Sequence, residues 1–271
     1  MAPESDGEPI DRPCKVQITG SGLLHRTDAL LERERNLYPL MADRLAGRGK
    51  GEFAEPAAVT MGMIEEAFTA RSDFGLRAAA FLAGRCDPGD AKAREKLTKL
   101  LRDFITSLEP HDRGPLEVEY IEAAMSLALR GDPEAARTAL AAVIPEGHSG
   151  SGYAYLAAFY LAQLGDASGY PVVLRALHSE NEHTRLMAVR HLLAFQPYNG
   201  QEVKGRVVDT RRELIARLSD HEPYVRVEVP YYLSEAGVTG LVELLEPLVL
   251  SDPDEGVREA AAEVLRRHRV S

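Results

Sequence analysis

A short motif ending in arginine recurs three times in the second half of this chain, and it constrains the fold more than any other feature. In each copy an alanine or valine stands three positions after the arginine, and a leucine stands four positions further on. The three copies are Ser179–Arg185, Ser219–Arg226 and Ser251–Arg258. Because the arginines are 41 and 32 residues apart, the chain is predicted to be built from repeats of one supersecondary unit.

The residues around each arginine favour the start of a helix. Asp220 and Asp252 stand where a helix N-cap is needed, and Pro223 and Pro253 stand near a first helical turn. A pair of such helices cannot bury its apolar face alone, so the pairs are expected to stack.

Helical spacing continues through most of the chain, and strand signals are nearly absent apart from a short extended piece at Val16–Ile18. Short breaks rich in Gly, Asp, Asn and Pro separate the segments. The expected helices are 28–45, 57–70, 74–84, 90–108, 115–130, 133–144, 151–164, 169–178, 182–195, 203–218, 222–236, 239–250 and 255–268.

The stretch Leu250–Leu265 resembles a HEAT repeat, close to the phycobilisome-lyase HEAT-like subtype. The resemblance implies an all-α fold, a right-handed α-solenoid of about five to six stacked helix pairs over residues 55–271. It also implies a hydrogen-bonded ladder along the stack. The ladder residues would be Asp220, Arg226, Asp252, Arg258 and Arg185.

Three departures from the HEAT pattern stand out. Arg185 is preceded by Glu180 at five residues rather than by an aspartate at six. Pro230 is expected to interrupt and kink the helix after Arg226. The segment 115–165 lacks a ladder arginine, so its pairs are expected to stack less regularly.

The pattern predicts three parts of the chain. Residues 1–22 combine Pro, Gly and acidic residues and are expected to form a mobile acidic tail. Residues 23–71 are expected to form an N-terminal helical cap, and residues 72–271 the HEAT-like solenoid.

Composition bears on partners and compartment. Lys plus Arg number 32 against 42 Asp plus Glu, so the formal net charge is −10, and tryptophan is absent. This balance argues against nucleic-acid binding, which needs a basic face. Two cysteines and no apolar N-terminal segment favour a cytoplasmic location. The longest uncharged segment, Gly147–Gly165, has a dense apolar part too short to span a membrane.

Patterns that would carry catalysis or ligand binding are incomplete. Gly20–Gly22 lacks the rest of a phosphate-binding loop, and Gly147–Gly152 lacks the frame of a nucleophile elbow. The spacing of His178, His183 and His191 matches no zinc motif. We therefore predict no catalytic residue, no cofactor and no metal.

Aromatic residues supply the candidates for partner contact, because exposed tyrosines suit protein interfaces. The candidates are Tyr153, Tyr155, Tyr160, Tyr170, Tyr231 and Tyr232. The predicted function is non-enzymatic protein binding on one face of the solenoid, as a scaffold or as a regulatory or neutralising subunit. The partner is expected to have a basic surface. The resemblance leaves open a bilin lyase or isomerase subunit and, less favoured, a HEAT-like nucleic-acid-binding protein.

Overall fold

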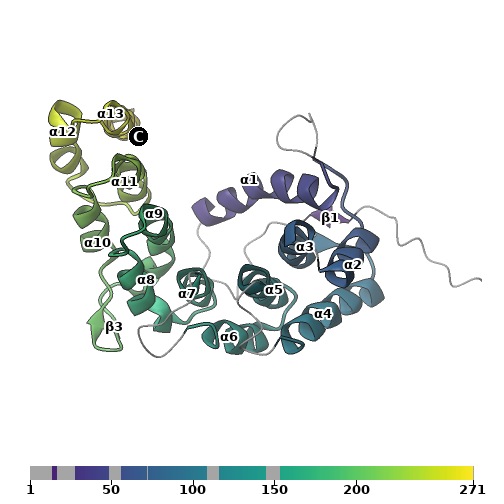
Figure 1. Cartoon of the computed structure of the whole chain (residues 1–271). Coiled ribbons are helices and arrows are strands. Elements are labelled where there is room, and N and C mark those ends of the chain that lie inside the picture. The colour runs from purple at the N-terminus through teal and green to yellow at the C-terminus, as the bar shows by residue number, and fades with distance from the viewer. Residues whose placement is uncertain are drawn as a thin grey trace, which may run out of the picture. The chain divides into compact units, whose positions relative to one another are not determined.

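The computed structural model describes residues 14–16, 28–48, 56–71, 73–108, 116–144 and 153–270, which are almost wholly helical (Figure 1). The chain divides into two compact units, residues 1–143 and 144–271. The all-α prediction is confirmed for the described residues. The division into tail, cap and solenoid stays a prediction.

Unit 1 is a group of helices with one very short pair of strands. Strand β1 (Lys15–Val16) pairs antiparallel with β2 (Cys86–Asp87), so this part of the expected tail has a fixed partner. The helices are α1 (Asp28–Leu45), α2 (Met61–Ala70), α3 (Asp73–Arg85), α4 (Ala91–Thr106), α5 (Glu117–Leu129) and α6 (Pro133–Ala141).

Helix α3 is the centre of unit 1, and α1, α2, α4 and α5 all pack against it. Its residues 78–83 are buried without exception. Gly84 allows α5 to approach closely, since a Cβ at this position would lie 2.6 Å from the Ser126 Cα. The Ser126 hydroxyl donates to the Ala80 carbonyl at 2.5 Å. Small residues therefore set the distance between these two helices.

Unit 2 is a series of helix pairs. Its helices are α7 (Ala154–Gln163), α8 (Tyr170–Ala176), α9 (Glu182–His191), α10 (Thr210–Arg217), α11 (Pro223–Glu235), α12 (Leu241–Ser251) and α13 (Glu255–Val270), with 3-10 turns at Ala167–Gly169 and Leu192–Tyr198. Helices α9, α11 and α13 pack one against the next, and α8, α10 and α12 each precede and contact one of them (Figure 1).

Two of the helices expected in unit 2 differ from those of the structure. The expected helix 203–218 is wrong in its first part, where β3 (Glu202–Val203) and β4 (Arg206–Val207) form a hairpin. Lys204 and Gly205 have φ values of 49° and 74°, which suit a tight hairpin turn and not a helix. The helix expected at 182–195 ends at His191 and continues as a 3-10 helix.

Of the interruption and kink expected at Pro230, the interruption is wrong and the kink stays a prediction. Pro230 lies inside α11, which runs without a break from Pro223 to Glu235. Pro230 itself is buried, so packing around α11 compensates for the hydrogen bond that proline cannot donate.

Candidate functional site

The motif arginines of unit 2 bind aspartates of the following repeat. Arg185 on α9 donates from Nε and Nη2 to the two carboxylate oxygens of Asp220, both at 3.0 Å. Its Nη1 donates to the carbonyls of Ser179 and Glu180, in the turn before its own helix. Both side chains of this ion pair are buried, at 3% and 2% exposure. Arg185 therefore joins the turn before its own helix to Asp220, which lies 35 residues further along the chain.

Arg226 repeats the arrangement one step along. Its Nε and Nη2 donate to Asp252 at 2.9 and 2.8 Å, and its Nη1 donates to the carbonyls of Asp220 and His221. Arg258 makes the same Nη1 contacts with the carbonyls of Asp252 and Pro253. The three guanidinium groups thus share one pose, set by the turn that precedes each helix.

The two ladder carboxylates are held in their charged form. Burial raises the pKa of Asp220, but hydrogen bonds from Arg185 and the Glu222 N–H, with the charge of Arg185, outweigh it and hold the pKa below its usual value. For Asp252 the hydrogen bonds from Arg226 are the largest cause of a lowered pKa, and burial opposes them. These groups stabilise the stack and are not exposed to a ligand.

Beside the ladder lies an open groove of about 350 Å³, which we call the acidic groove. Its six lining residues come from the starts of α9 and α11 and from the turn before α13, because each motif places its acidic turn at the same end of the stack. The residues are Glu182, Glu222, Pro223, Tyr224, Val227 and Asp254.

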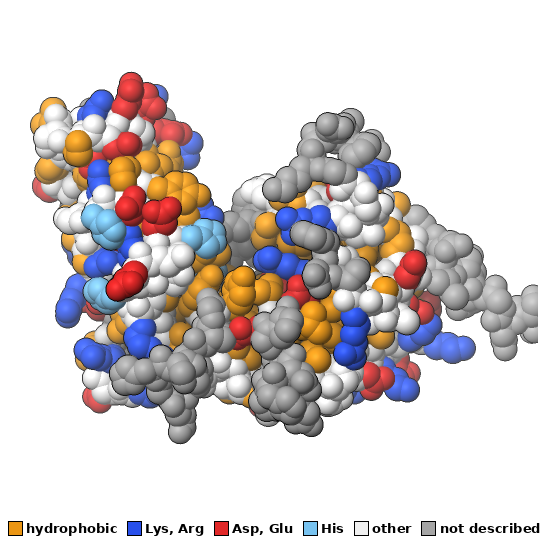
Figure 2. Space-filling model, in the orientation of Figure 1, with side chains coloured by type: hydrophobic (Ala, Val, Ile, Leu, Met, Phe, Trp, Pro, Cys, Tyr) orange, Lys and Arg blue, Asp and Glu red, His pale blue; other side chains and the backbone are white. Residues whose placement is uncertain are grey.

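The acidic groove combines negative charge with apolar surface. Three of its six residues are carboxylates and none is basic. Tyr224 is 56% exposed, and it lies next to the apolar side chains of Pro223 and Val227. Acidic, hydrophobic and histidine side chains lie together over α9 and α11 in Figure 2. Such a surface suits a partner segment with both basic and apolar groups.

Sequence reasoning did not single out this groove, although a signal for it was present. Glu182, Glu222 and Asp254 stand three or four positions before Arg185, Arg226 and Arg258, respectively. Residues at equivalent positions of stacked repeats lie at the same end of the stack. The acidic residues that precede each motif arginine therefore line the groove, while the arginines themselves hold the neighbouring turns together.

Most of the tyrosines expected to contact a partner are buried, and for these the expectation is not supported. Tyr155, Tyr160, Tyr170 and Tyr232 are at most 6% exposed. The Tyr170 hydroxyl accepts a hydrogen bond from the Asp209 N–H, so this ring is a core residue with a satisfied polar group.

The other two tyrosines reach the surface to different extents. Tyr231 is half-buried and donates to the Glu263 carboxylate at 2.8 Å, which links α11 to α13. Tyr153 is 44% exposed. Of the six, Tyr153 is the tyrosine whose surface is most available to a partner.

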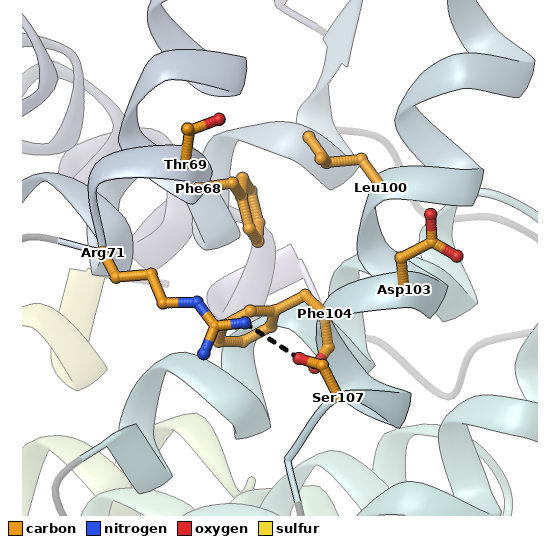
Figure 3. Close-up of a pocket in the computed structure, with 7 residues that line it drawn as sticks. All are labelled: Phe68, Thr69, Arg71, Leu100, Asp103, Phe104 and Ser107. Atoms are coloured by element: carbon orange, nitrogen blue, oxygen red, sulfur yellow. Dashed lines mark hydrogen bonds between the residues drawn. The ribbon is translucent and has the colours of Figure 1, made fainter.

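A second pocket, of about 260 Å³, lies between α2 and α4 in unit 1 (Figure 3). The rings of Phe68 and Phe104 meet edge to face at 5.2 Å. The Arg71 guanidinium lies 5.9 Å from the centre of the Phe104 ring and donates to the Ser107 hydroxyl at 3.1 Å. The guanidinium of Arg71 is thus already engaged by other residues that line the pocket.

The described residues contain neither a cluster suited to a metal ion nor a helix suited to span a membrane. No group of three or more His, Cys, Asp or Glu side chains there is arranged to hold a metal ion. His191 stacks on the Phe159 ring with centroids 4.3 Å apart, so it is a packed core residue. No described helix combines the length and apolar character needed to cross a membrane. Gly20–Gly22 and Gly147–Gly152 lie outside the described residues.

Comparison with known proteins identifies one part of the chain. Residues 200–266 match the family model of HEAT repeats. No curated protein and no solved structure matches the chain. The match spans α10 to α13, and so includes the Arg226–Asp252 rung and the part of the acidic groove built by α11 and the start of α13. The segment that carries most of the candidate site is therefore similar to HEAT repeats.

Proposed function

We propose that unit 2 is a protein-binding module whose acidic groove takes a basic segment of a partner protein. HEAT repeats generally mediate protein–protein interaction, and the match to them covers most of the groove. The observation that carries the proposal is the composition of the groove: three carboxylates and an exposed tyrosine, with no basic lining residue.

Electrostatic attraction supplies the first step of association. The chain has a formal net charge of −10, which attracts a basic surface over several ångströms and raises the rate of encounter. Lysine or arginine side chains of the partner would then meet Glu182, Glu222 and Asp254 in the groove. Each exposed ion pair contributes about 1 kcal/mol or less to the binding free energy. Such pairs therefore affect partner specificity and association rate more than affinity.

Tyr224 supplies the short-range contact. Its exposed ring is open to an arginine or lysine, and such cation–π contacts contribute about 0.5–2 kcal/mol. Pro223 and Val227 add apolar surface beside it. Tyrosine and arginine are frequent at the residues that dominate interface energetics, so Tyr224 is expected to be the residue that most affects the dissociation rate.

The wider form of the proposal is a right-handed solenoid of five to six helix pairs that acts in the cytoplasm as a scaffold, regulatory or neutralising subunit. The succession of α9, α11 and α13 supports stacking within unit 2. The match to HEAT repeats in general does not favour bilin chemistry over this function. We propose no nucleic-acid partner, because the groove is acidic.

The test uses the full chain and a fluorescent octa-arginine peptide. Binding is measured across salt concentration for the wild type and for the double variant Glu182→Lys/Glu222→Lys. Asp254 is left unchanged because it accepts the Val257 N–H at the start of α13. We expect at least a tenfold loss of affinity in the double variant, several-fold faster dissociation in Tyr224→Ala, and weaker wild-type binding as salt rises.

The matched control places the same charge change elsewhere in unit 2. Glu243 and Glu246 are exposed residues of α12 that do not line the groove. The variant Glu243→Lys/Glu246→Lys is expected to keep the affinity within about twofold. Equal losses in both double variants would show that net charge alone binds the peptide, and the groove proposal would fail. Tighter binding of duplex DNA than of the peptide would favour a nucleic-acid partner instead.

A further inference from the structure

The two cysteines of the chain come from distant segments and meet in unit 1. Val16 in β1 pairs with Cys86 in β2. Cys14 lies two residues before Val16, so its side chain and that of Cys86 leave the same face of the strand pair. The Cys14 N–H donates to the Val59 carbonyl at 2.7 Å, which fixes the backbone there. The two thiols are close enough for each to change the pKa of the other.

Burial separates these thiols from ordinary surface cysteines. Cys14 is 9% exposed and Cys86 is 1% exposed, and both are free. Cys14 therefore lies nearer to solvent, and Cys86 lies behind it. A small oxidant would reach Cys14 first.

The half-buried guanidinium of Arg130 lies next to the pair. The Nε of Arg130 donates to the Ala83 carbonyl at 2.7 Å, and its Nη2 donates to the carbonyl of Cys86 itself. Both bonds hold the guanidinium at the end of α3, where it stabilises a negative charge on sulfur.

The two thiols are not equivalent. The hydrogen bond from Cys86 lowers the pKa of Cys14, burial opposes this change, and the charge of Arg130 adds to it. The pKa of Cys86 is raised, first by that same hydrogen bond and then by burial. Of the two sulfurs, Cys14 is thus the one that loses its proton more readily.

We propose that Cys14 and Cys86 form a peroxide-sensitive modification site that closes to a reversible disulfide. The Cys14 thiolate attacks one oxygen of hydrogen peroxide; an S–O bond forms, the O–O bond breaks, and hydroxide leaves. Cys86 then loses its proton and its sulfur attacks the Cys14 sulfenic acid. The S–S bond forms, the S–O bond breaks, and the hydroxyl group leaves as water with that proton. The two sulfurs together lose two electrons, and peroxide is reduced to water.

The disulfide would change the stability of unit 1. It would close a loop over residues 14–86, which contains α1, α2 and α3. Closing so long a loop restricts the unfolded chain, so the oxidised form is expected to melt several degrees higher than the reduced form. The site is separate from the acidic groove, and its chemistry does not depend on the proposed function.

The experiment treats the reduced full chain with a small excess of hydrogen peroxide and follows it by intact mass and by alkylation after denaturation. We expect a mass loss of about 2 Da, the loss of both alkylation sites, and a peptide that joins Cys14 to Cys86, all reversed by dithiothreitol. Cys86→Ser is expected to trap Cys14 as a sulfenic acid that reacts with dimedone, whereas Cys14→Ser leaves Cys86 largely unmodified.

Arg130 provides a control of the mechanism. Arg130→Lys keeps a positive charge and is expected to change the oxidation rate less than threefold, whereas Arg130→Gln slows it about tenfold. The proposal is overturned if peroxide leaves both wild-type thiols free, if only disulfides between two chains form, or if Cys86 oxidises as fast in Cys14→Ser as Cys14 does in Cys86→Ser. The wild-type mass spectrum decides the first two outcomes without any variant.

Discussion

Units 1 and 2 hold neighbouring helices together by different means. In unit 1, α3 meets α5 through Gly84, Ala80 and Ser126, with side chains so small that the backbones nearly touch. In unit 2, the loops before α11 and α13 are held by the Arg185–Asp220 and Arg226–Asp252 pairs. The α3–α5 contact depends on the absence of large side chains, whereas the contacts in unit 2 depend on buried ion pairs.

This difference explains which part of the chain is recognisable. An aspartate and an arginine at a fixed spacing form a specific sequence pattern, and the match to HEAT repeats at 200–266 covers it. Glycine, alanine and serine occur at many helical positions for many reasons, so the α3–α5 contact leaves a weak pattern. Close helix packing can therefore leave a clear sequence pattern in unit 2 and a weak one in unit 1.

The largest expected effect is on the buried rung. Arg185→Ala leaves the Asp220 carboxylate buried without its partner, and we expect the free energy of unfolding of unit 2 to fall by about 3–5 kcal/mol. Urea denaturation measures the loss, and hydrogen exchange assigns it to α9 and α11. The control is Arg190→Ala on the same helix, whose ion pair with Glu228 is 35% and 26% exposed and whose loss should cost about 1 kcal/mol or less. Equal effects of the two variants would show that the buried rung stabilises unit 2 no more than an exposed ion pair does.

Gly84→Val tests the corresponding contact in unit 1. Its Cβ would lie 2.6–2.7 Å from three atoms of Ser126, so α3 and α5 must separate, at a cost of about 3 kcal/mol. Ala91→Val, at an exposed position of α4, adds the same branched side chain and should cost about 0.5 kcal/mol. Hydrogen exchange is expected to rise in unit 1 alone. A loss confined to unit 2 would contradict the prediction.

Arg226 and Arg258 differ in their partners. Arg226 binds the Asp252 carboxylate as well as carbonyls of the preceding turn, whereas the hydrogen bonds of Arg258 go to the preceding turn. Arg226→Ala removes two bonds to Asp252 and two to carbonyls, and we expect a loss of about 1–3 kcal/mol. Arg258→Ala removes the carbonyl bonds of a less buried group, and its effect should stay within about 0.5 kcal/mol. Thermal melts of the two variants provide the measurement, and a larger loss for Arg258→Ala would show that the ladder description is wrong.

Acid should weaken unit 2 more than unit 1 through the ladder carboxylates. The pKa of Asp220 and of Asp252 is lower in the folded chain than its usual value, so the unfolded state binds these protons more readily. The stabilisation is therefore present above the usual aspartate pKa of about 4 and is lost as pH falls through the folded-state value. We expect the free energy of unfolding of the wild type to fall more steeply below about pH 4 than that of Asp252→Asn. Parallel curves would show that the rung does not titrate with folding.

Much of the local structure could be read from residue spacing. The expected helices 222–236 and 255–268 agree closely with α11 and α13, because a cap, a first turn and an apolar stripe all lie within one helix. The hairpin at 202–207 was not predicted, because the residues of its turn give only a weak local signal. Its turn depends on positive φ values at Lys204 and Gly205, and only the glycine gives a sequence signal for that conformation.

The tyrosines show where residue type alone is insufficient. Tyr170 and Tyr224 are chemically identical, yet one is fully buried and the other is 56% exposed. Tyr170 follows a 3-10 turn and its hydroxyl reaches the Asp209 N–H, 39 residues away. Tyr224 is the second residue of α11. In the turn just before it, the buried Asp220 takes part in the ladder. Burial here depends on which face of a helix its neighbours cover.

The sequence by itself determined most of the helices and the repeated turn, because these depend on groups within a few positions of one another, and the resemblance to HEAT repeats implied the ladder residues. Tertiary structure alone decided that Glu182, Glu222 and Asp254 share one groove and that Cys14 meets Cys86. Those neighbours are separated by about 30 to 70 residues of chain, and their meeting depends on how whole helices pack. Helix periodicity specifies which face is buried, but packing geometry specifies what that face meets.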